Sequence, residues 1–272
     1  YCLCILIKQY FKNKNFVLFT FQANIYALIL SYFLKFRIVS RSNSSPSGWG
    51  NNFLKKIIFK FFFKKADCII VNSKEFQKEF KKNFKVNTSL IYNPLNKKEI
   101  LNNSKKKIKN KTFETDSLKI INIARLTDQK DHSTLIKAIK IIVKKIKCNL
   151  IIIGYGVNEI NIRNEINKLK LKKFIKIVHC KVNPFPYLKA SELFILSSKF
   201  EGLPNVLLEA MSLKKFVISS NCPTGPKEIL KNGKYGSLIK IDDAKKLSSL
   251  LLNIDKSKNK YKTLAFKGFN SL

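Results

Sequence analysis

The chain has 272 residues, 45% of them hydrophobic, which is enough for one large domain or two modest domains with real cores. A formal net charge of +36 would fit a nucleic-acid-binding protein, but only four of the 53 basic residues are arginine, the residue that base-reading proteins favour. The lysines are spread along the whole chain, so we expect no nucleic-acid partner and consider a basic surface that favours anionic lipid the better interpretation.

The first informative segment is an uncharged run from Asn15 to Leu34, which is long enough to cross a bilayer. It contains polar residues, however, and divides into a strand at 16–21, a helix at 25–36 and, beyond the run, a strand at 37–40. This βαβ interpretation explains the boundaries as well as the composition. We therefore favour it over a transmembrane helix.

The alternation of strands and helices continues to residue 96. We expect a helix at 53–65, a strand at 68–71, a helix at 74–82 and a strand at 89–92. The helix at 53–65 is basic and amphipathic. Its lysines at positions 56, 60 and 64 stand beside an apolar flank formed by Leu54, Ile57, Ile58 and Phe61. That flank either lies on a membrane surface or belongs to the domain core.

Residues 97–117 are rich in lysine and poor in apolar side chains, so we expect a linker between a first domain at 1–96 and a second domain at 118–272. In the second domain we expect strands at 118–123, 149–153, 174–178, 193–196, 216–219 and 237–241. Helical segments alternate with them, for example at 133–147. Such alternation predicts a parallel, doubly wound α/β sheet, and ligands of such sheets bind at the carboxyl ends of the strands.

The segment Ser197 to Glu228 carries the strongest chemical signal. A strand end leads through an acidic loop with Glu201 into a helix that opens at Pro204 or Asn205 and contains a second carboxylate, Glu209. A helix N-terminus favours phosphate, and ionised carboxylates accept hydrogen bonds from sugar and ribose hydroxyls. The segment thus predicts a site for a ligand that carries both phosphate groups and sugar hydroxyls.

Five motifs in order extend this signal: IARLTDQKD, LIIIGYG, NPFPYLKASELFILSS, EGLPNVLLEAM and TGPKEILKNGKYGSLI. Together they resemble the family-4 glycosyltransferases, retaining enzymes of the GT-B fold, over roughly residues 118–272. The resemblance implies two Rossmann-like, doubly wound domains facing a cleft. The family has further strands before the position of Tyr1, so we expect an N-terminally truncated, incomplete first domain.

The resemblance also implies the roles of individual residues. It places Arg125 and Lys130 on the donor diphosphate, Glu201 on the donor sugar at the reaction centre, and Glu209 on the ribose. It brings the backbone of the following loop and helix start close to the sugar and the phosphates: Gly202, Leu203, Pro204 and Asn205.

Several positions remain open at this point. Gly154 and Gly156 either permit close approach of a ligand or simply form turns, and residues 224–226 form either a second anion-binding turn or a helix cap. Asn183 and Pro184 resemble the loop beside the base, but Cys180 stands where the family often has glycine. Residues 40–46 resemble an acceptor-side loop. Many members carry a histidine near the reaction centre on the first domain, but residues 1–96 contain none, so no acid or base is assigned.

Metal ions and cofactors are not expected. The only adjacent acidic pair, Asp242 and Asp243, opens a helix at 244–252, where it acts as a cap. Arg125 and Lys130 would neutralise the diphosphate in place of a metal. The six cysteines are scattered without a CxxC pair, so we expect neither a zinc site nor disulfides, and reduced thiols of a cytoplasmic protein.

These observations predict a glycosyltransferase that moves a sugar with retention from a nucleotide diphosphate sugar, most simply a UDP-sugar, to a lipid-linked or oligosaccharide or polysaccharide acceptor. We expect it in the cytoplasm, in peripheral contact with the inner face of the membrane. The alternative is a non-catalytic basic protein that binds anionic membrane or nucleic acid. Such a protein would not require Glu201, Glu209, Arg125 and Lys130 in one site. A phosphorylase of the same fold would need a cofactor-lysine motif that we do not find.

Overall fold

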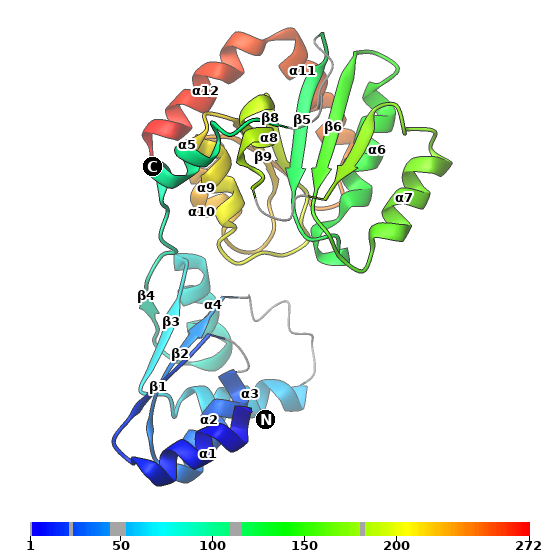
Figure 1. Cartoon of the computed structure of the whole chain (residues 1–272). Helices are drawn as coiled ribbons and strands as arrows, with labels where there is room; N and C mark the ends of the chain where they lie inside the picture. Colours follow the sequence, from blue (N-terminus) through cyan, green and yellow to red (C-terminus); the bar gives the residue numbers. More distant parts are fainter. Residues whose placement is uncertain (1, 22–23, 44–52, 109–115, 180–182) are drawn as a thin grey trace. The chain divides into compact units, whose positions relative to one another are not determined.

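The computed structural model describes residues 2–21, 24–43, 53–108, 116–179 and 183–272, and these fall into two compact units. The first comprises residues 1–93 with 223–225, and the second comprises 94–222 with 226–272. Figure 1 colours the part of the first unit before residue 94 blue to cyan, and most of the second unit green to red. Residues 44–46 of the predicted acceptor-side loop, and Cys180, lie outside the described residues.

The first unit is a parallel sheet with the order β1-β2-β3-β4. Its elements are α1 (Cys2–Lys12), β1 (Val17–Thr20), α2 (Asn24–Leu34), β2 (Arg37–Ser42), α3 (Phe53–Phe63), β3 (Cys68–Val71), α4 (Lys74–Phe84) and β4 (Ser89–Leu90). The βαβ interpretation of the uncharged run is confirmed, because β1 pairs in parallel with β2 on either side of α2. Among the described residues, no helix is both long and apolar enough to cross a membrane.

The core of the first unit is built largely from phenylalanine. Phe76, Phe80 and Phe84 recur at four-residue spacing along α4, and all three are buried beside Phe63 of α3. The inner face of α3 also includes Phe59 and Phe62. The apolar flank predicted on this helix therefore does not belong to the core: Leu54, Ile57, Ile58 and Phe61 are between 46% and 69% exposed.

The second unit is a larger parallel sheet with the order β10-β9-β8-β5-β6-β7. Its strands are β5 (Leu118–Ile123), β6 (Cys148–Ile153), β7 (Ile175–Val178), β8 (Leu193–Leu196), β9 (Phe216–Ser220) and β10 (Ser237–Ile239). Its longer helices are α6 (His132–Ile142), α7 (Glu159–Lys168), α9 (Asn205–Ser212), α11 (Ala244–Lys256) and α12 (Lys258–Asn270). Shorter helical segments are α5 (Lys97–Asn103), η2 (Asp128–Lys130), α8 (Phe185–Ala190), α10 (Pro226–Ile229) and η3 (Lys231–Gly233).

The expected linker differs from the structure at its start. Residues 97–103 form helix α5, and its Ile100 is buried in the core of the second unit. Asn96 caps this helix by accepting a hydrogen bond from the Glu99 backbone N–H at 3.0 Å. A short helix with one buried apolar side chain therefore docks on the second unit before the lysine-rich segment begins.

The strand order of the second sheet reverses between β5 and β8. From β5 the chain continues outward through β6 and β7, whereas β8, β9 and β10 follow on the other side. The strands are almost continuously apolar because helices cover both faces, and all four residues of β8 are buried. Such a reversal is the point where open parallel sheets bind ligands, at the carboxyl ends of the strands.

Candidate functional site at the carboxyl edge of the second sheet

The loops that follow β5 and β8 lie next to each other at the strand reversal. The β5 loop carries Arg125, which is exposed, and Lys130, which ends the short helix η2. The β8 loop carries Ser198 and Glu201. Inside the sheet, Asn122 of β5 donates from its amide Nδ2 to the Ile195 carbonyl oxygen of β8 at 2.8 Å. The two strands are thereby joined just below the site.

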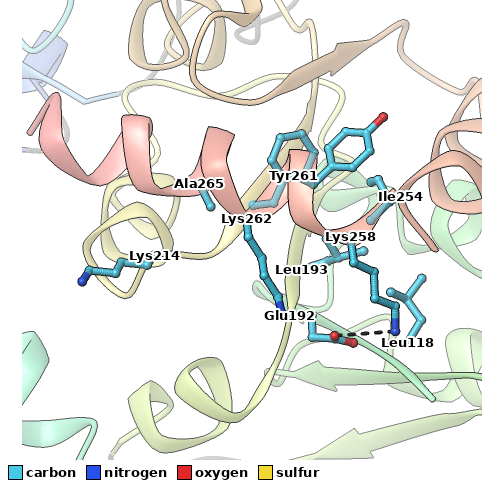
Figure 2. A pocket seen from close by; sticks show the side chains of 10 residues that line it. Leu118, Glu192, Leu193, Lys214, Ile254, Lys258, Tyr261, Lys262 and Ala265 are labelled. Carbon is cyan, nitrogen blue, oxygen red and sulfur yellow. Dashed lines mark ion pairs between the residues drawn. The ribbon is translucent and has the colours of Figure 1, made fainter. Parts of the chain in front are cut away.

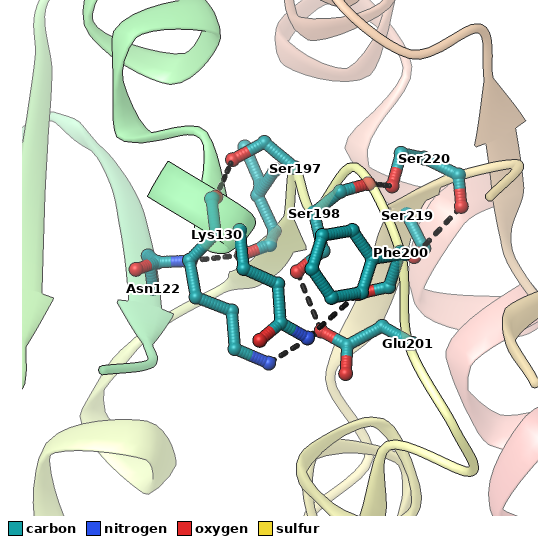
Figure 3. A network of polar contacts seen from close by, with 10 residues as sticks. Asn122, Lys130, Ser197, Ser198, Phe200, Glu201, Ser219 and Ser220 are labelled. Atoms are coloured by element: carbon teal, nitrogen blue, oxygen red, sulfur yellow. Dashed lines mark hydrogen bonds and ion pairs between the residues drawn. The ribbon is translucent and has the colours of Figure 1, made fainter. Parts of the chain in front are cut away.

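Lys130 and Glu201 form an ion pair at the centre of this edge. The Lys130 Nζ lies 2.5 Å from Oε1 of Glu201, and both side chains are largely buried, with 13% and 7% of their surfaces exposed. The Ser198 hydroxyl donates to the same carboxylate oxygen at 2.5 Å. Figure 3 shows the ammonium group and the hydroxyl converging on this carboxylate. The structure thus brings together two residues that are 71 positions apart in the sequence.

Hydrogen bonds to backbone carbonyl oxygens fix the positions of the two loops. The Lys199 N–H donates to the Gln129 carbonyl oxygen at 2.8 Å, and the Gln129 amide Nε2 donates to the Phe200 carbonyl oxygen, also at 2.8 Å. The Ser197 hydroxyl donates to the carbonyl oxygen of Asp131 at 2.8 Å. The Lys130 and Glu201 side chains therefore project from a cross-linked platform, which preorganises their geometry.

Helix α9 begins directly after this loop, as predicted. Pro204 is its N-cap, with φ −73° and ψ 99°, and makes no side-chain capping hydrogen bond. The backbone N–H of Leu207 donates to the Pro204 carbonyl oxygen at 3.0 Å. The positive end of the helix dipole thus lies at the loop that contains Gly202, Leu203 and Glu201.

Glu209 lies in the second turn of α9 and is half-buried. Burial raises its pKa above the ordinary value of a glutamate. Within the described part of the chain, its carboxylate makes no hydrogen bond or ion pair, and burial alone accounts for the shift. A half-buried carboxylate without a protein partner is suited to receive hydrogen bonds from a ligand.

Gly154 and Gly156 allow the loop after β6 to pack against the loop after β5. A Cβ atom on Gly154 would lie 1.9 Å from the Ala124 carbonyl oxygen, and one on Gly156 would lie 2.4 Å from the Leu126 carbonyl oxygen. The Leu126 N–H donates to the Tyr155 carbonyl oxygen at 2.9 Å between them. Both glycines therefore support the loop that carries Arg125.

His132 was not predicted as a site residue, although it follows the motif that contains Lys130. Its side chain is buried, and neither ring nitrogen has a hydrogen-bond partner in the described residues. Burial lowers its pKa to about 4, so the imidazole is neutral at neutral pH. It lines a cavity of about 160 Å³ together with Asp128, Asp131 and Glu165. Only a structure reveals this, because the sequence does not show which face of α6 holds position 132.

The remaining predicted residues have structural contacts. Asp243 caps α11 by accepting from the Lys246 N–H at 2.8 Å, which confirms the predicted capping role for this member of the acidic pair, whereas Asp242 accepts from the Thr134 hydroxyl at 3.1 Å. Asn183 accepts from the Phe185 N–H at 3.1 Å and so stabilises the start of α8. Thr224 is buried, and Gly225 adopts φ 85° before the short helix α10. In the described residues, no group of three or more His, Cys, Asp or Glu side chains is arranged to hold a metal ion.

A small pocket also occurs at the opposite, amino-terminal edge of the second sheet (Figure 2). It lies between α12 and the first residues of β5, β8 and β9, and measures about 40 Å³. Lys258 and Glu192 face each other there at 3.8 Å. This volume is far below the roughly 300–1,000 Å³ of small-molecule pockets, so we do not consider this pocket a nucleotide site.

Comparisons with known proteins show the family to which the chain belongs. The family described as "Glycosyl transferases group 1" matches residues 103–269. An uncharacterized glycosyltransferase of Methanocaldococcus jannaschii is 37% identical over 227 residues, which are 76% of this chain and 56% of the relative. The N-acetylgalactosamine-N,N'-diacetylbacillosaminyl-diphospho-undecaprenol 4-alpha-N-acetylgalactosaminyltransferase of Campylobacter jejuni is 29% identical over 245 residues, 85% of this chain and 64% of the relative. The chain thus spans somewhat over half the length of these relatives.

Among solved structures, Anabaena HepE in complex with UDP superposes with a TM-score of 0.75 at 17% sequence identity. The superposition covers 93% of this chain and 72% of that protein. At this identity the likeness concerns the fold, and it confirms the predicted GT-B class of parallel α/β domains.

Proposed function

Because the chain belongs to the family of glycosyl transferases group 1, we propose that it transfers a sugar, with retention at the anomeric carbon, from a UDP-sugar to a lipid-linked or polysaccharide acceptor. The acceptor product would enter a cell-surface glycan. The single observation that carries this proposal is the Lys130–Glu201–Ser198 cluster at the strand reversal. It offers one cation and one carboxylate to a ligand that carries both phosphates and hydroxyls.

The diphosphate would bind to the cations of the β5 loop. Arg125 is exposed at the strand end, and its guanidinium can hold phosphate oxygens in a bidentate manner. Lys130 and the N-terminus of α9 add positive potential nearby. When the bond between the sugar and the diphosphate breaks, negative charge develops on the leaving phosphate. These groups would stabilise that charge without a metal ion or another cofactor.

Glu201 would accept hydrogen bonds from the hydroxyls of the donor sugar. Its buried carboxylate is held in place by Lys130 and Ser198, so a sugar bound there has a defined orientation relative to the diphosphate. The backbone of Gly202, Leu203 and the start of α9 would border the same sugar. Precise positioning of the reacting carbon is a main source of rate enhancement in group transfer.

Glu209 would hold the ribose through its two hydroxyls. The raised pKa of this carboxyl group follows from burial without a protein partner, and two hydroxyl donors would favour the ionised form again. Donor binding and ionisation of Glu209 are therefore linked, and donor affinity should fall as the pH decreases through the pKa of Glu209.

The choice of UDP and of a lipid-linked acceptor takes support from related proteins. HepE was solved with UDP, and the C. jejuni relative is named for a diphospho-undecaprenol acceptor. An acceptor of this kind lies in a membrane, so we also propose that the protein works in the cytoplasm at the inner face of the cytoplasmic membrane.

Titration calorimetry of the chain with UDP, GDP and ADP tests the donor assignment. We expect one clear preference, for UDP. Binding of none of the three would overturn the proposal and favour the non-catalytic alternative. With a suitable lipid-diphosphate acceptor, NMR of the product's anomeric proton should show the configuration of the donor sugar, and inversion would refute retention.

A further inference from the structure

Helix α3 exposes a stripe of large apolar side chains to solvent. The stripe consists of Leu54, Ile57, Ile58 and Phe61, which are 69%, 51%, 47% and 46% exposed. These positions follow the i, i+3, i+4, i+7 pattern of one helix face. The opposite face of the same helix is occupied by the core phenylalanines, so the stripe is a second apolar face and not a poorly packed core.

Aromatic residues of α2 extend the stripe sideways. Phe33 and Tyr32 are 69% and 42% exposed, and the rings of Tyr32 and Phe61 lie 5.6 Å apart in an edge-to-face arrangement. The ammonium group of Lys65 lies 5.6 Å from the Phe61 ring centroid and 5.8 Å from that of Tyr32. The two helices therefore present one continuous surface, which we call the α2–α3 face.

The charge on this face has a single sign. The sequences of α2 and α3 contain no aspartate or glutamate, whereas Lys56, Lys60, Lys64 and Lys65 are all exposed along or just after α3. A second copy of the chain would bring lysines against lysines across such an interface. The complementary partner is a surface that is both apolar and negatively charged.

We propose that the α2–α3 face docks on a membrane that contains anionic lipid. The apolar stripe would enter the boundary between headgroups and acyl chains, with Tyr32, Phe33 and Phe61 at the depth that aromatic rings prefer, while the lysines contact the headgroups. The inference deepens the proposed function, since it brings the enzyme to a lipid-linked acceptor. The docking itself does not depend on which sugar is transferred.

Sedimentation with vesicles tests the contribution of charge. The probe is a vesicle of equimolar phosphatidylglycerol and phosphatidylcholine, and a pure phosphatidylcholine vesicle is the uncharged comparison. The triple substitution K56Q/K60Q/K64Q should weaken binding to the anionic vesicle by about ten-fold or more, since each lysine near an anionic surface contributes several-fold.

The matched control is K78Q/K81Q/K82Q on α4, which removes the same charge from another exposed helix of the same unit. It should change binding by less than about two-fold if contact is confined to the α2–α3 face. Equal losses in the two triple variants would overturn the proposal, because the binding would then reflect only the net charge of +36.

Insertion of the apolar stripe is tested by fluorescence. The single tryptophan, Trp49, is replaced by phenylalanine, and Phe33→Trp or, as a control, Phe266→Trp is added. Phe266 is 49% exposed on α12 in the other unit. Anionic vesicles should shift the emission of the Phe33→Trp variant to shorter wavelength and leave the Phe266→Trp variant unchanged. An unshifted Phe33→Trp variant, or a stripe-dependent dimer without vesicles, would refute lipid docking.

UDP calorimetry on every variant separates the two proposals. Loss of vesicle binding with intact UDP affinity supports docking through this face. Failure to bind vesicles in the wild type, with UDP bound normally, would end the docking proposal alone. Failure to bind UDP in the wild type, with vesicles bound normally, would end the donor assignment alone.

Discussion

Replacing Glu209 by glutamine should have opposite effects on donor affinity and on stability. Glutamine keeps the shape of the side chain but removes the charge that would accept two ribose hydroxyls. Hydrogen bonds to a charged group contribute about 1.5–3 kcal/mol, against about 0.5–1.5 kcal/mol for neutral pairs. Two weakened bonds therefore amount to about 2 kcal/mol, and UDP affinity should fall by about ten-fold or more.

Stability should change in the other direction. Burial raises the pKa of Glu209, so the folded state binds the proton more tightly than the unfolded state does. The charged carboxyl group therefore destabilises the fold above its pKa, and this effect disappears as the pH falls through that pKa. At neutral pH, Glu209→Gln removes the charge and should raise the melting temperature of the ligand-free protein.

Calorimetry with UDP and 2′-deoxy-UDP measures the first effect, and thermal unfolding without ligand measures the second. The wild type should lose affinity for the deoxynucleotide, whereas Glu209→Gln should discriminate less between the two ligands. The wild-type affinity should decline with falling pH more than the affinity of the variant does. Unchanged UDP affinity in Glu209→Gln, or a lower melting temperature, would show that the carboxylate has a structural partner and does not hold the ribose.

Further tests concern other parts of the site. Lys130→Ala should lower UDP affinity by about ten-fold or more. The control is Lys137→Ala, which removes an exposed lysine of α6 and should leave UDP affinity unchanged. Similar losses of UDP affinity in both variants would indicate a general charge effect. Gly156→Ala places a methyl group 2.4 Å from the Leu126 carbonyl oxygen, and the clash should displace the Arg125 loop and lower both stability and UDP affinity. If this variant bound UDP as tightly as the wild type, the result would argue against Arg125 as a phosphate ligand. His132 binds its proton less tightly in the folded state, where its pKa is about 4. Acidification from about pH 6.5 to about pH 4 should therefore lower the free energy of unfolding of the wild type by about 3 kcal/mol, as measured by urea unfolding. The variant His132→Gln should lack this part of the pH dependence. Transfer activity should survive EDTA, and loss that Mg²⁺ or Mn²⁺ restores would contradict the metal-free diphosphate site.

Much of the second unit can be predicted from the sequence because its local signals agree with one another. Its strands are runs such as LFIL in β8, and its helix starts carry clear caps such as Asp243. Helix α5 is missed because its sequence, KKEILNN, has little apolar content; the cap at Asn96 with Glu99 three residues later is a local start signal, but the burial of Ile100 is visible only in the structure. Local pattern cannot reveal a single long-range contact.

Helix α3 shows a different limit of prediction from sequence. It carries two apolar faces, one with Phe59 and Phe63 and one with Ile57 and Phe61, and periodicity alone does not tell which faces the sheet. The candidate site shows a third limit. The sequence places Lys130 and Glu201 after two separate strands, but their pairing depends on the strand order, which sets β5 directly beside β8.

The Lys130–Glu201 pair has a consequence for competition among cellular anions. A free phosphate or pyrophosphate that binds Lys130 must share or break this 2.5 Å contact, and Glu201 then keeps its other partners, among them the Ser198 hydroxyl, but loses its cation. Removing the cation from a buried carboxylate is unfavourable. A nucleotide sugar compensates both partners at once, since its phosphates meet the ammonium group while its hydroxyls meet the carboxylate. If the proposed function holds, the closed pair would favour a nucleotide sugar over a simple anion, and UDP alone, which has no sugar hydroxyls for Glu201, should bind more weakly than the UDP-sugar.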